Sequence, residues 1–188
     1  MSAGRPASAE QAEPGFPGTR VPAECEAWIG FGANLGDRLG SIQRALTFFE
    51  PCLEAVSPIF ETAPWGVLDQ PWFLNGVARL RWTSGPESLL ARCLSIEQEL
   101  GRTRGKRNGP RTIDLDVLLL GPSAYSVPGL SVPHPGIASR RSVLEPWAAL
   151  SPDLVVPGLT DSIGTLCVRA QALGGQEVRS FELPEMKS

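Results

Sequence analysis

Apolar runs broken by turn residues predict strands and helices in alternation along the first half of the chain. Residues 27–32 form an apolar run that enters a glycine-rich turn, which is typical of a buried strand. From residue 37 onward, apolar side chains recur at helical spacing until Pro51, which cannot continue a helix. A second strand is expected over residues 53–62. Residues 73–83 alternate between apolar and polar side chains, which predicts a third strand.

The second half completes an arrangement of two strand-helix-strand units. Ser84 and Glu87 have the spacing of a capping box, and the helix that they open is expected to end at Gly101. A mostly apolar run over residues 113–120 predicts a fourth strand. This order favours an α+β fold of the ferredoxin-like, split βαβ-βαβ type, with helices on one face of the sheet. Two further helices are expected as C-terminal additions, over residues 139–150 and 163–172.

The first 24 residues differ in composition from the rest. They contain four prolines and almost no apolar side chains, so they cannot offset the entropy lost on ordering. We therefore expect a disordered tail over residues 1–24 and one domain over residues 25–188. The sequence has neither an apolar run of about 20 residues that could span a bilayer nor the apolar centre of a signal peptide. Its four cysteines lack zinc-site or redox spacing, which indicates reduced thiols in a cytoplasmic protein.

Two acidic residues stand out in the fourth predicted strand. Asp114 and Asp116 are two positions apart, so their side chains share one face of the strand. Carboxylates held this close repel each other unless a cation lies between them. Oxygen ligands favour Mg²⁺, which needs few protein carboxylates when substrate phosphates complete its shell. By itself, the pair could also be two acids on a solvated strand face.

A basic loop directly precedes this pair. Residues 102–111 include no acid and hold five of the chain's 17 cationic residues, namely Arg102, Arg104, Lys106, Arg107 and Arg111. Guanidinium groups grip phosphate oxygens, while carboxylates hold the bridging metal ions. A solvated turn would explain the loop alone, but the loop and the acidic pair together favour nucleotide phosphate chemistry. The net charge of −3 gives no overall case for a nucleic-acid or membrane partner.

Two further features have both a functional and a purely structural interpretation. His134 lies between two prolines in a loop that they hold extended; it could donate to a phosphate or be an ordinary exposed histidine. Phe73 and Asn75 share a strand face, where a ring and an amide would suit a flat heterocycle. Phe73 could equally belong to the core, and Asn75 could hold a neighbouring loop.

Residues 107–118 resemble the signature of the 6-hydroxymethyl-7,8-dihydropterin pyrophosphokinase family; they read RNGPRTIDLDVL. The resemblance covers residues 27–173, with shorter matches in order at GANLG (32–36), ETAPWG (61–66), DQPWFLN (69–75), Glu97 through Arg102, and VPHP (132–135). It implies a ferredoxin-like α+β enzyme of folate biosynthesis. Such an enzyme transfers pyrophosphate from ATP to the hydroxymethyl oxygen of a reduced pterin and releases AMP.

The resemblance also implies roles for single residues. Asp114 and Asp116 would hold two Mg²⁺ ions that bridge the triphosphate, and Arg102 and Arg111 would clamp the transferring phosphates; these four form the implied catalytic set. The implied ATP-binding set adds Glu97, Arg104, Arg107, Ser131, His134 and Arg140. The implied pterin-binding set comprises Thr62, Ala63, Pro64, Trp65, Phe73, Asn75 and Asp114. The expected partners are then ATP and the reduced pterin, without nucleic acid or membrane, and the chain is expected to be a monomer.

The sequence departs from the family pattern at two positions. Asn108 stands where a tryptophan is common, and Ser142 stands where an aromatic ring usually covers the second face of the pterin. Trp65 is our sequence-based candidate for the missing ring. Two other interpretations stay open at this point: an RNA-binding module, which can share the split βαβ fold but stacks bases on aromatic side chains, and a family member that binds pterin without catalysis.

Overall fold

The computed structural model describes residues 24–182 apart from residues 65, 103–108 and 128. Most of the predicted tail therefore lies outside the described residues, as do Trp65, Arg104 and Arg107 of the implied site. Within the described part, no helix is long and apolar enough to cross a membrane.

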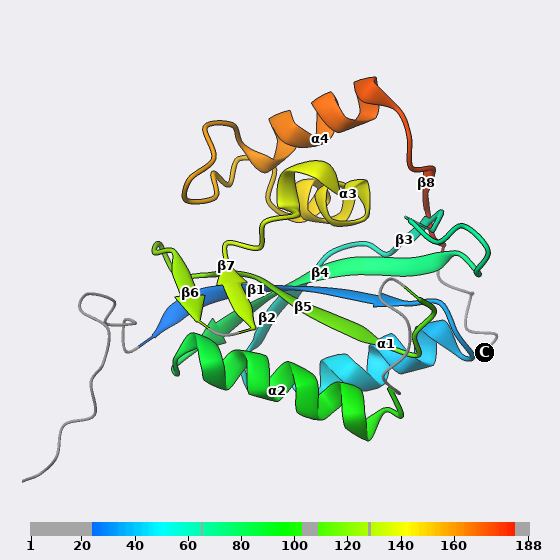
Figure 1. Ribbon diagram of the computed structural model, residues 1–188. Helices are drawn as coiled ribbons and strands as arrows, with labels where there is room; N and C mark the ends of the chain where they lie inside the picture. Colours follow the sequence, from blue (N-terminus) through cyan, green and yellow to red (C-terminus); the bar gives the residue numbers. More distant parts are fainter. Residues whose placement is uncertain (1–23, 65, 103–108, 128, 183–188) are drawn as a thin grey trace, which may run out of the picture.

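Six described strands form one sheet in the order β5-β1-β4-β3-β8, with β2 also paired to β4 (Figure 1). All paired neighbours are antiparallel. Because β4 lies between β1 and the β2 and β3 strands, the two predicted strand-helix-strand units interleave. The strand bounds are β1 (Cys25–Ala33), β2 (Leu53–Val56), β3 (Phe60–Thr62), β4 (Phe73–Trp82), β5 (Asp114–Leu120) and β8 (Val178–Ser180).

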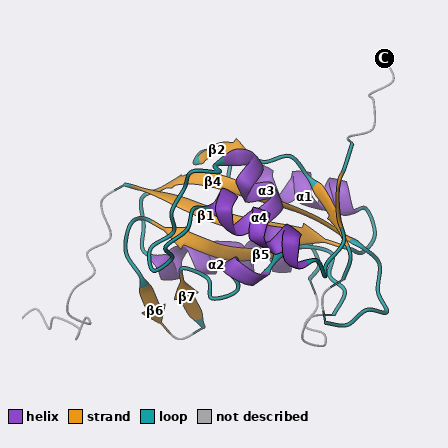
Figure 2. Ribbon diagram, turned by 90° about the horizontal axis from the view of Figure 1, so that it is seen from above, coloured by secondary structure: helices purple, strands orange, loops and turns teal. Residues whose placement is uncertain are grey.

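Helices cover both faces of this sheet (Figures 1 and 2). Helices α1 (Arg38–Thr47) and α2 (Pro86–Glu99) are the first two helices that the sequence predicts. They pack on one face of the sheet, over a core that includes Ile29 and Leu80. The C-terminal pair, α3 (Arg141–Leu150) and α4 (Ile163–Leu173), covers the opposite face. The α+β class is therefore confirmed, and the structure adds that the C-terminal helices enclose the second face rather than leaving it open.

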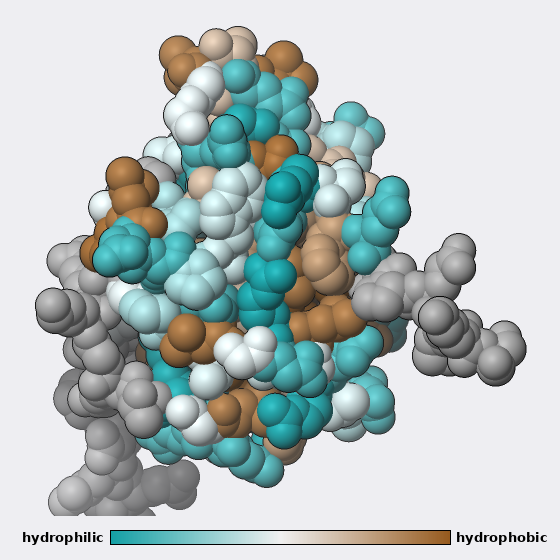
Figure 3. All heavy atoms as spheres, turned by 90° about the vertical axis from the view of Figure 1, so that its right-hand side faces the viewer, coloured by the Kyte–Doolittle hydropathy of each residue, from teal (hydrophilic) through white to brown (hydrophobic). Residues whose placement is uncertain are grey.

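A second core holds α3 and α4 against the sheet. Trp28 of β1 and Trp147 of α3 are both almost fully buried, with ring centroids 5.4 Å apart. Val77 of β4 is buried in the same cluster. Burial of each such side chain contributes about 1.5–3 kcal/mol, which explains why two short helices stay docked on this face. The outer side of α4 is exposed, and apolar atoms gather there at the top of Figure 3.

Several details differ from the sequence-based prediction. The predicted strand over residues 53–62 is two strands, because Pro58 lacks an N–H and Ser57 bonds Val77 through both its backbone N–H and its hydroxyl (2.9 and 3.0 Å). The predicted capping box does not form: Gly85 precedes a proline, stays extended, and is itself the N-cap of α2. The short strands β6 (Tyr125–Val127), β7 (Leu130–Val132) and β8 were not predicted.

Regular alternation in β5 ends after Val117. A register shift opposite Trp28 and Ile29 forms a bulge, so Leu118 and Leu119 both join the core under α3 and α4, and Leu120 joins the opposite core. The strict alternation expected of a strand would place Leu119 on the same face as Leu115 and Val117, and the structure shows that this expectation is wrong. A bulge inserts one unpaired residue and reverses the facing of those that follow.

Candidate active site

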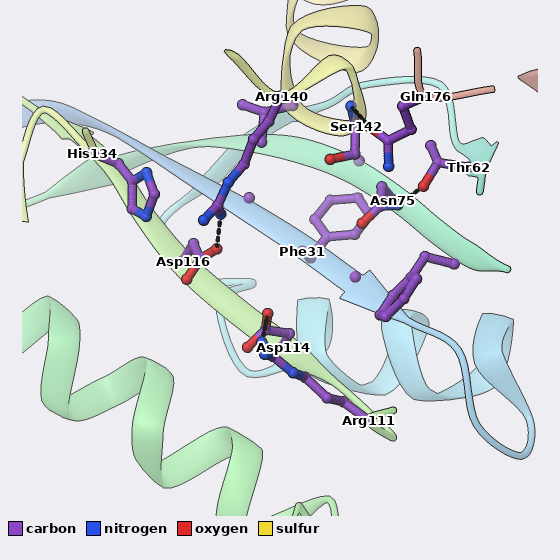
Figure 4. A pocket seen from close by; sticks show the side chains of 15 residues that line it. Phe31, Thr62, Asn75, Arg111, Asp114, Asp116, His134, Arg140, Ser142 and Gln176 are labelled. Atoms are coloured by element: carbon purple, nitrogen blue, oxygen red, sulfur yellow. Dashed lines mark hydrogen bonds and ion pairs between the residues drawn. The ribbon is translucent and has the colours of Figure 1, made fainter. Parts of the chain in front are cut away.

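A cavity of about 300 Å³ lies between the sheet and the N-terminal end of α3 (Figure 4). This volume is at the lower end of the range for sites that enclose small ligands. Eight of the implied site residues line it: Thr62, Phe73, Asn75, Arg111, Asp114, Asp116, His134 and Arg140. The structure thus brings together residues from the three strands β3, β4 and β5 and from the segments before β5 and before α3, up to 78 positions apart in the chain.

The acidic pair faces the cavity without cover from the neighbouring strand. Asp114 is paired in register with Gly32 of β1, and Asp116 with Gly30. Because glycine has no side chain, both carboxylates are left accessible from the cavity. Burial raises the pKa of Asp116, and repulsion from the Asp114 carboxylate raises it further.

Three arginines partly neutralise the pair. Arg102 Nη1 lies 2.8 Å from one oxygen of Asp114, and Arg111 forms an ion pair with the other. Arg140 Nη1 lies 3.6 Å from Asp116 Oδ2. The carboxylates and guanidinium groups therefore form one continuous charged surface on this side of the cavity, as a polyphosphate with bound cations would require.

Two buried polar residues hold these arginines in place. The Asn34 side chain accepts the backbone N–H of Arg111 (2.7 Å) and donates to Gln70 Oε1 (3.1 Å) and to the carbonyl of Pro71 (2.9 Å). Glu97 is 2% exposed; its Oε1 accepts the backbone N–H of Leu115 (2.7 Å) and pairs with Arg102. Glu97 does not line this cavity, so it acts here through Arg102 and the strand β5.

His134 is held in a defined orientation. Its backbone N–H donates to the carbonyl of Leu118 (2.9 Å), and its Nδ1 accepts the backbone N–H of Gly136 (3.0 Å). A neutral imidazole whose Nδ1 accepts carries its proton on Nε2. Burial lowers the pKa of His134, although Asp116 opposes the shift, so the ring offers one N–H donor to a phosphate.

The opposite end of the cavity suits a flat, polar ring. Asn75 Nδ2 donates to Thr62 Oγ1 (2.7 Å), which fixes the orientation of the amide beside Phe73. A Cβ at Gly32 would lie 2.5 Å from Asn75 Oδ1, and a Cβ at Gly76 would lie 2.2 Å from the ring of Phe31. Glycine is therefore required at both positions to let these side chains lie against the backbone.

A second hollow adjoins the first through Asp116 and His134. It also contains Ser131, and its apolar lining comes from α2, β5 and β7, with Leu90, Leu115, Val117 and Leu130. Of the implied ATP-binding residues, Ser131 is thus set apart from the basic side of the main cavity. This arrangement offers a base or ribose an apolar surface next to the phosphate-sized charged region.

Sequence reasoning missed several residues of the main cavity, among them Phe31 and Gln176. Phe31 lies within a run that looks like ordinary core, and Gln176 follows α4 in a segment with no recognisable motif. Ser142, noted only as a departure, also lines the cavity. Of the implied pterin loop, Ala63 accepts a hydrogen bond from Gln176 (2.7 Å).

The edge of the sheet next to the cavity is held by a charged cluster. Glu61 pairs with Arg38 (2.7 Å) and with Arg179 of β8 (2.5 Å), and Arg179 lies over the ring of Trp72 at 4.6 Å. Burial alone would raise the pKa of Glu61, but the two arginines together outweigh it and lower the pKa. This cluster joins β8 to α1 and to the loop before β4.

The donor set at Asp114 and Asp116 fits a divalent metal ion. A cation between the carboxylates would relieve the repulsion that raises the pKa of Asp116. No group of three or more His, Cys, Asp or Glu able to hold a metal occurs in the described ranges. The protein would therefore supply carboxylates, and substrate phosphates would complete the shell, as is usual for Mg²⁺.

Comparisons with known proteins agree with this geometry. A family model described as 7,8-dihydro-6-hydroxymethylpterin-pyrophosphokinase matches residues 28–152. A Pseudomonas aeruginosa 2-amino-4-hydroxy-6-hydroxymethyldihydropteridine pyrophosphokinase is 45% identical over 134 residues, which cover 69% of this chain and 83% of that protein. A Methylorubrum extorquens protein of the same name is 41% identical over 138 residues, covering 71% of this chain and 87% of its own.

Some similar proteins are much longer. The Schizosaccharomyces pombe folic acid synthesis protein fol1 is 44% identical over 135 residues, which are 70% of this chain but only 18% of fol1. A crystal structure of an HPPK-DHPS in complex with substrates superposes with a TM-score of 0.65 at 11% identity, over 78% of this chain and 43% of that one. At that identity the superposition supports the fold alone. With a family model over residues 28–152 and bacterial relatives matched over most of their length, the chain belongs to the 7,8-dihydro-6-hydroxymethylpterin pyrophosphokinase family.

Proposed function

We propose that this chain transfers pyrophosphate from ATP to the hydroxymethyl group of 6-hydroxymethyl-7,8-dihydropterin in folate biosynthesis and requires Mg²⁺. In this reaction the hydroxymethyl oxygen forms a bond to the β-phosphorus of ATP and loses its proton. The bond between the β-phosphorus and the oxygen of AMP breaks, and AMP leaves. The observation that carries the proposal is one cavity with an acidic pair and arginines at one end and a Phe-Asn pocket at the other.

The charged end of the cavity would hold the triphosphate. We assign Arg102 and Arg111 to the transferring phosphates and Asp114 and Asp116 to two Mg²⁺ ions, because both arginines form ion pairs with Asp114 and both carboxylates line the cavity. When bound, the metal ions would neutralise phosphate charge at the attacking and leaving oxygens. Transfer of this kind depends on positioning and charge neutralisation more than on a nucleophilic side chain.

Other residues complete the ATP side of the proposal. His134 would donate its Nε2 proton to a phosphate, and Arg140 would approach the nucleotide across Asp116. Ser131 would contact the nucleoside in the second hollow. Glu97 is assigned to positioning Arg102, since it is buried beneath it. The assignments of Arg104 and Arg107 rest on the sequence resemblance alone.

The pterin would occupy the other end. Phe73 offers a face for stacking, and Asn75, held by Thr62, offers an amide to the edge of the ring. The loop at Ala63 and Pro64 would contact the same edge. The Trp65 assignment rests on the sequence resemblance, since Trp65 lies outside the described residues. We also propose that residues 25–188 form the catalytic domain and that the chain acts as a cytoplasmic monomer; its four free cysteines are compatible with a reducing compartment.

An RNA-binding module is disfavoured by a specific observation. Such modules present aromatic side chains on an open sheet face, whereas α3 and α4 cover the corresponding face here and bury Trp28 and Val77. Incubation of the purified protein with ATP and Mg²⁺ separates the remaining functions. We expect AMP, and no ADP, to form only when 6-hydroxymethyl-7,8-dihydropterin is added. A protein that binds the pterin but forms no AMP would be the non-catalytic family member instead.

A further inference from the structure

The segment after α4 returns to the main cavity. Gly174 and Gly175 both have positive φ angles (71° and 103°), which reverse the chain. Gln176 follows at once, and β8 then pairs with β3, with Val178 opposite Thr62. Gln176 is half-buried and lines the cavity, although it lies beyond the residues that the family model covers.

The side-chain amide of Gln176 joins two walls of the cavity. Its Nε2 donates to the carbonyl of Ala63 (2.7 Å), and its Oε1 accepts the backbone N–H of Ser142 (3.2 Å). Arg141 adds a third tie by donating to the backbone carbonyl of Gln176 (2.8 Å). The loop after β3 and the first turn of α3 are thereby held at a fixed separation across the cavity.

The bond to Ser142 replaces a missing helix cap. The first N–H groups of a helix have no partner within it, and the N-cap residue of α3, Arg140, provides no side-chain acceptor. Gln176 supplies that acceptor from 34 positions further along the chain. Arg140, two residues before Ser142, is held separately at the charged end of the cavity by its ion pair with Asp116.

The amide retains one hydrogen for a ligand. A glutamine Nε2 carries two hydrogens, and the Ala63 carbonyl accepts one. Figure 4 shows Gln176 and Ser142 together on the α3 side, with the amide nitrogen directed toward the cavity above Asn75. Because Ser142 is small, the planar amide of Gln176 is the polar surface that faces a heterocycle lying over Asn75.

We propose that Gln176 is a binding residue for the pterin, which it contacts from the α3 side while it holds the Ala63 loop in place. This inference rests on the proposed function, because it takes the heterocycle in the cavity to be the pterin substrate. Part of the selectivity for a flat ring with hydrogen-bond acceptors then comes from the C-terminal segment and not from the family motifs.

The test is a titration of 6-hydroxymethyl-7,8-dihydropterin into the protein saturated with Mg²⁺ and α,β-methylene-ATP. Gln176→Ala removes the amide, and Gln176→Met keeps its length but not its hydrogen bonds. Both are expected to raise the pterin Kd roughly three- to thirtyfold, the scale of one to two hydrogen bonds. The Kd of the ATP analogue is expected to stay within about twofold. Gln171→Ala is the matched control, since Gln171 is exposed on α4 and bonds Glu145 outside the cavity.

Gln176→Glu gives a second, directional readout. It keeps the acceptor for Ser142 but places a carboxylate oxygen against the Ala63 carbonyl, so it is expected to bind pterin more weakly than Gln176→Met. A pterin Kd within twofold of the parent in both the Ala and Met variants would overturn the inference. If the parent itself binds no pterin, the proposed function fails and this inference fails with it; a parent that binds and turns over pterin separates the two.

Discussion

Replacing Asn34 by alanine is expected to damage both stability and the phosphate side of the site. Asn34 is 2% exposed and forms three hydrogen bonds, with the Arg111 backbone N–H, the Pro71 carbonyl and the Gln70 side chain. These bonds tie β1 to two segments far away in the sequence. Arg111 in turn holds Asp114, so a change at Asn34 is transmitted to the acidic pair.

The expected loss follows from those contacts. A buried hydrogen bond contributes about 0.5–1.5 kcal/mol, and a buried N–H left without a partner costs about 1–3 kcal/mol. Because Gln70 is only half-buried, its bond contributes at the low end. We therefore expect Asn34→Ala to lower the free energy of unfolding by about 2–4 kcal/mol, with a large part of the loss due to the unpaired Arg111 N–H.

Urea denaturation followed by tryptophan fluorescence measures this directly. With an m value of about 2 kcal/mol/M, the midpoint is expected to fall by about 1–2 M at unchanged m. Gln70→Ala is the matched control, because it removes one of the three bonds and should cost no more than about 1 kcal/mol. A midpoint for Asn34→Ala that matches the Gln70→Ala variant would refute the argument that the Arg111 and Pro71 bonds dominate.

Three further predictions concern charge and the tail. Asp114→Asn and Asp116→Asn should each lower turnover by at least about 100-fold without loss of folding, whereas Asp153→Asn on the surface should change neither; near-normal turnover in both site variants would contradict the metal assignment. Glu61 has a lowered pKa, so its ionised form stabilises the fold above pH 4.5 and this contribution is lost as the pH falls. Melting scans should therefore show Glu61→Gln less stable at pH 7 but less sensitive to acid than the parent; equal acid sensitivity would contradict the assignment. Deleting residues 1–22 should leave the melting temperature and activity unchanged, because this segment has little apolar surface to dock, and a drop of several degrees would show that it packs.

The sequence was most informative where periodicity and motif coincide. The alternation in β4 and the apolar runs at β1 and β5 predicted the strands of two strand-helix-strand units, since period and turn residues are local properties. The spacing of Asp114 and Asp116 placed both carboxylates on one face, and the structure has both lining the cavity. For the same reason, Phe73 and Asn75 could be placed together.

Features that depend on distant contacts could not be predicted. The bulge in β5 arises from its pairing with Trp28 and Ile29, and no local pattern marks it. The strand β8 is three residues long and forms against β3, which is 116 positions away at Thr62 and Val178. Gln176 is a single polar residue after two glycines; its role depends on Ala63 and Ser142, which only the folded chain brings to it.

Following the phosphorus atoms of ATP tests the central proposal most directly. ATP labelled at the β-phosphorus is incubated with the protein, Mg²⁺ and 6-hydroxymethyl-7,8-dihydropterin, in parallel with ATP labelled at the α-phosphorus, and the products are separated. We expect the β label in the pterin product and the α label in AMP, with neither reaction proceeding when Mg²⁺ or the pterin is left out. Release of the β label in ADP, or AMP formation without the pterin, would contradict pyrophosphate transfer by this site.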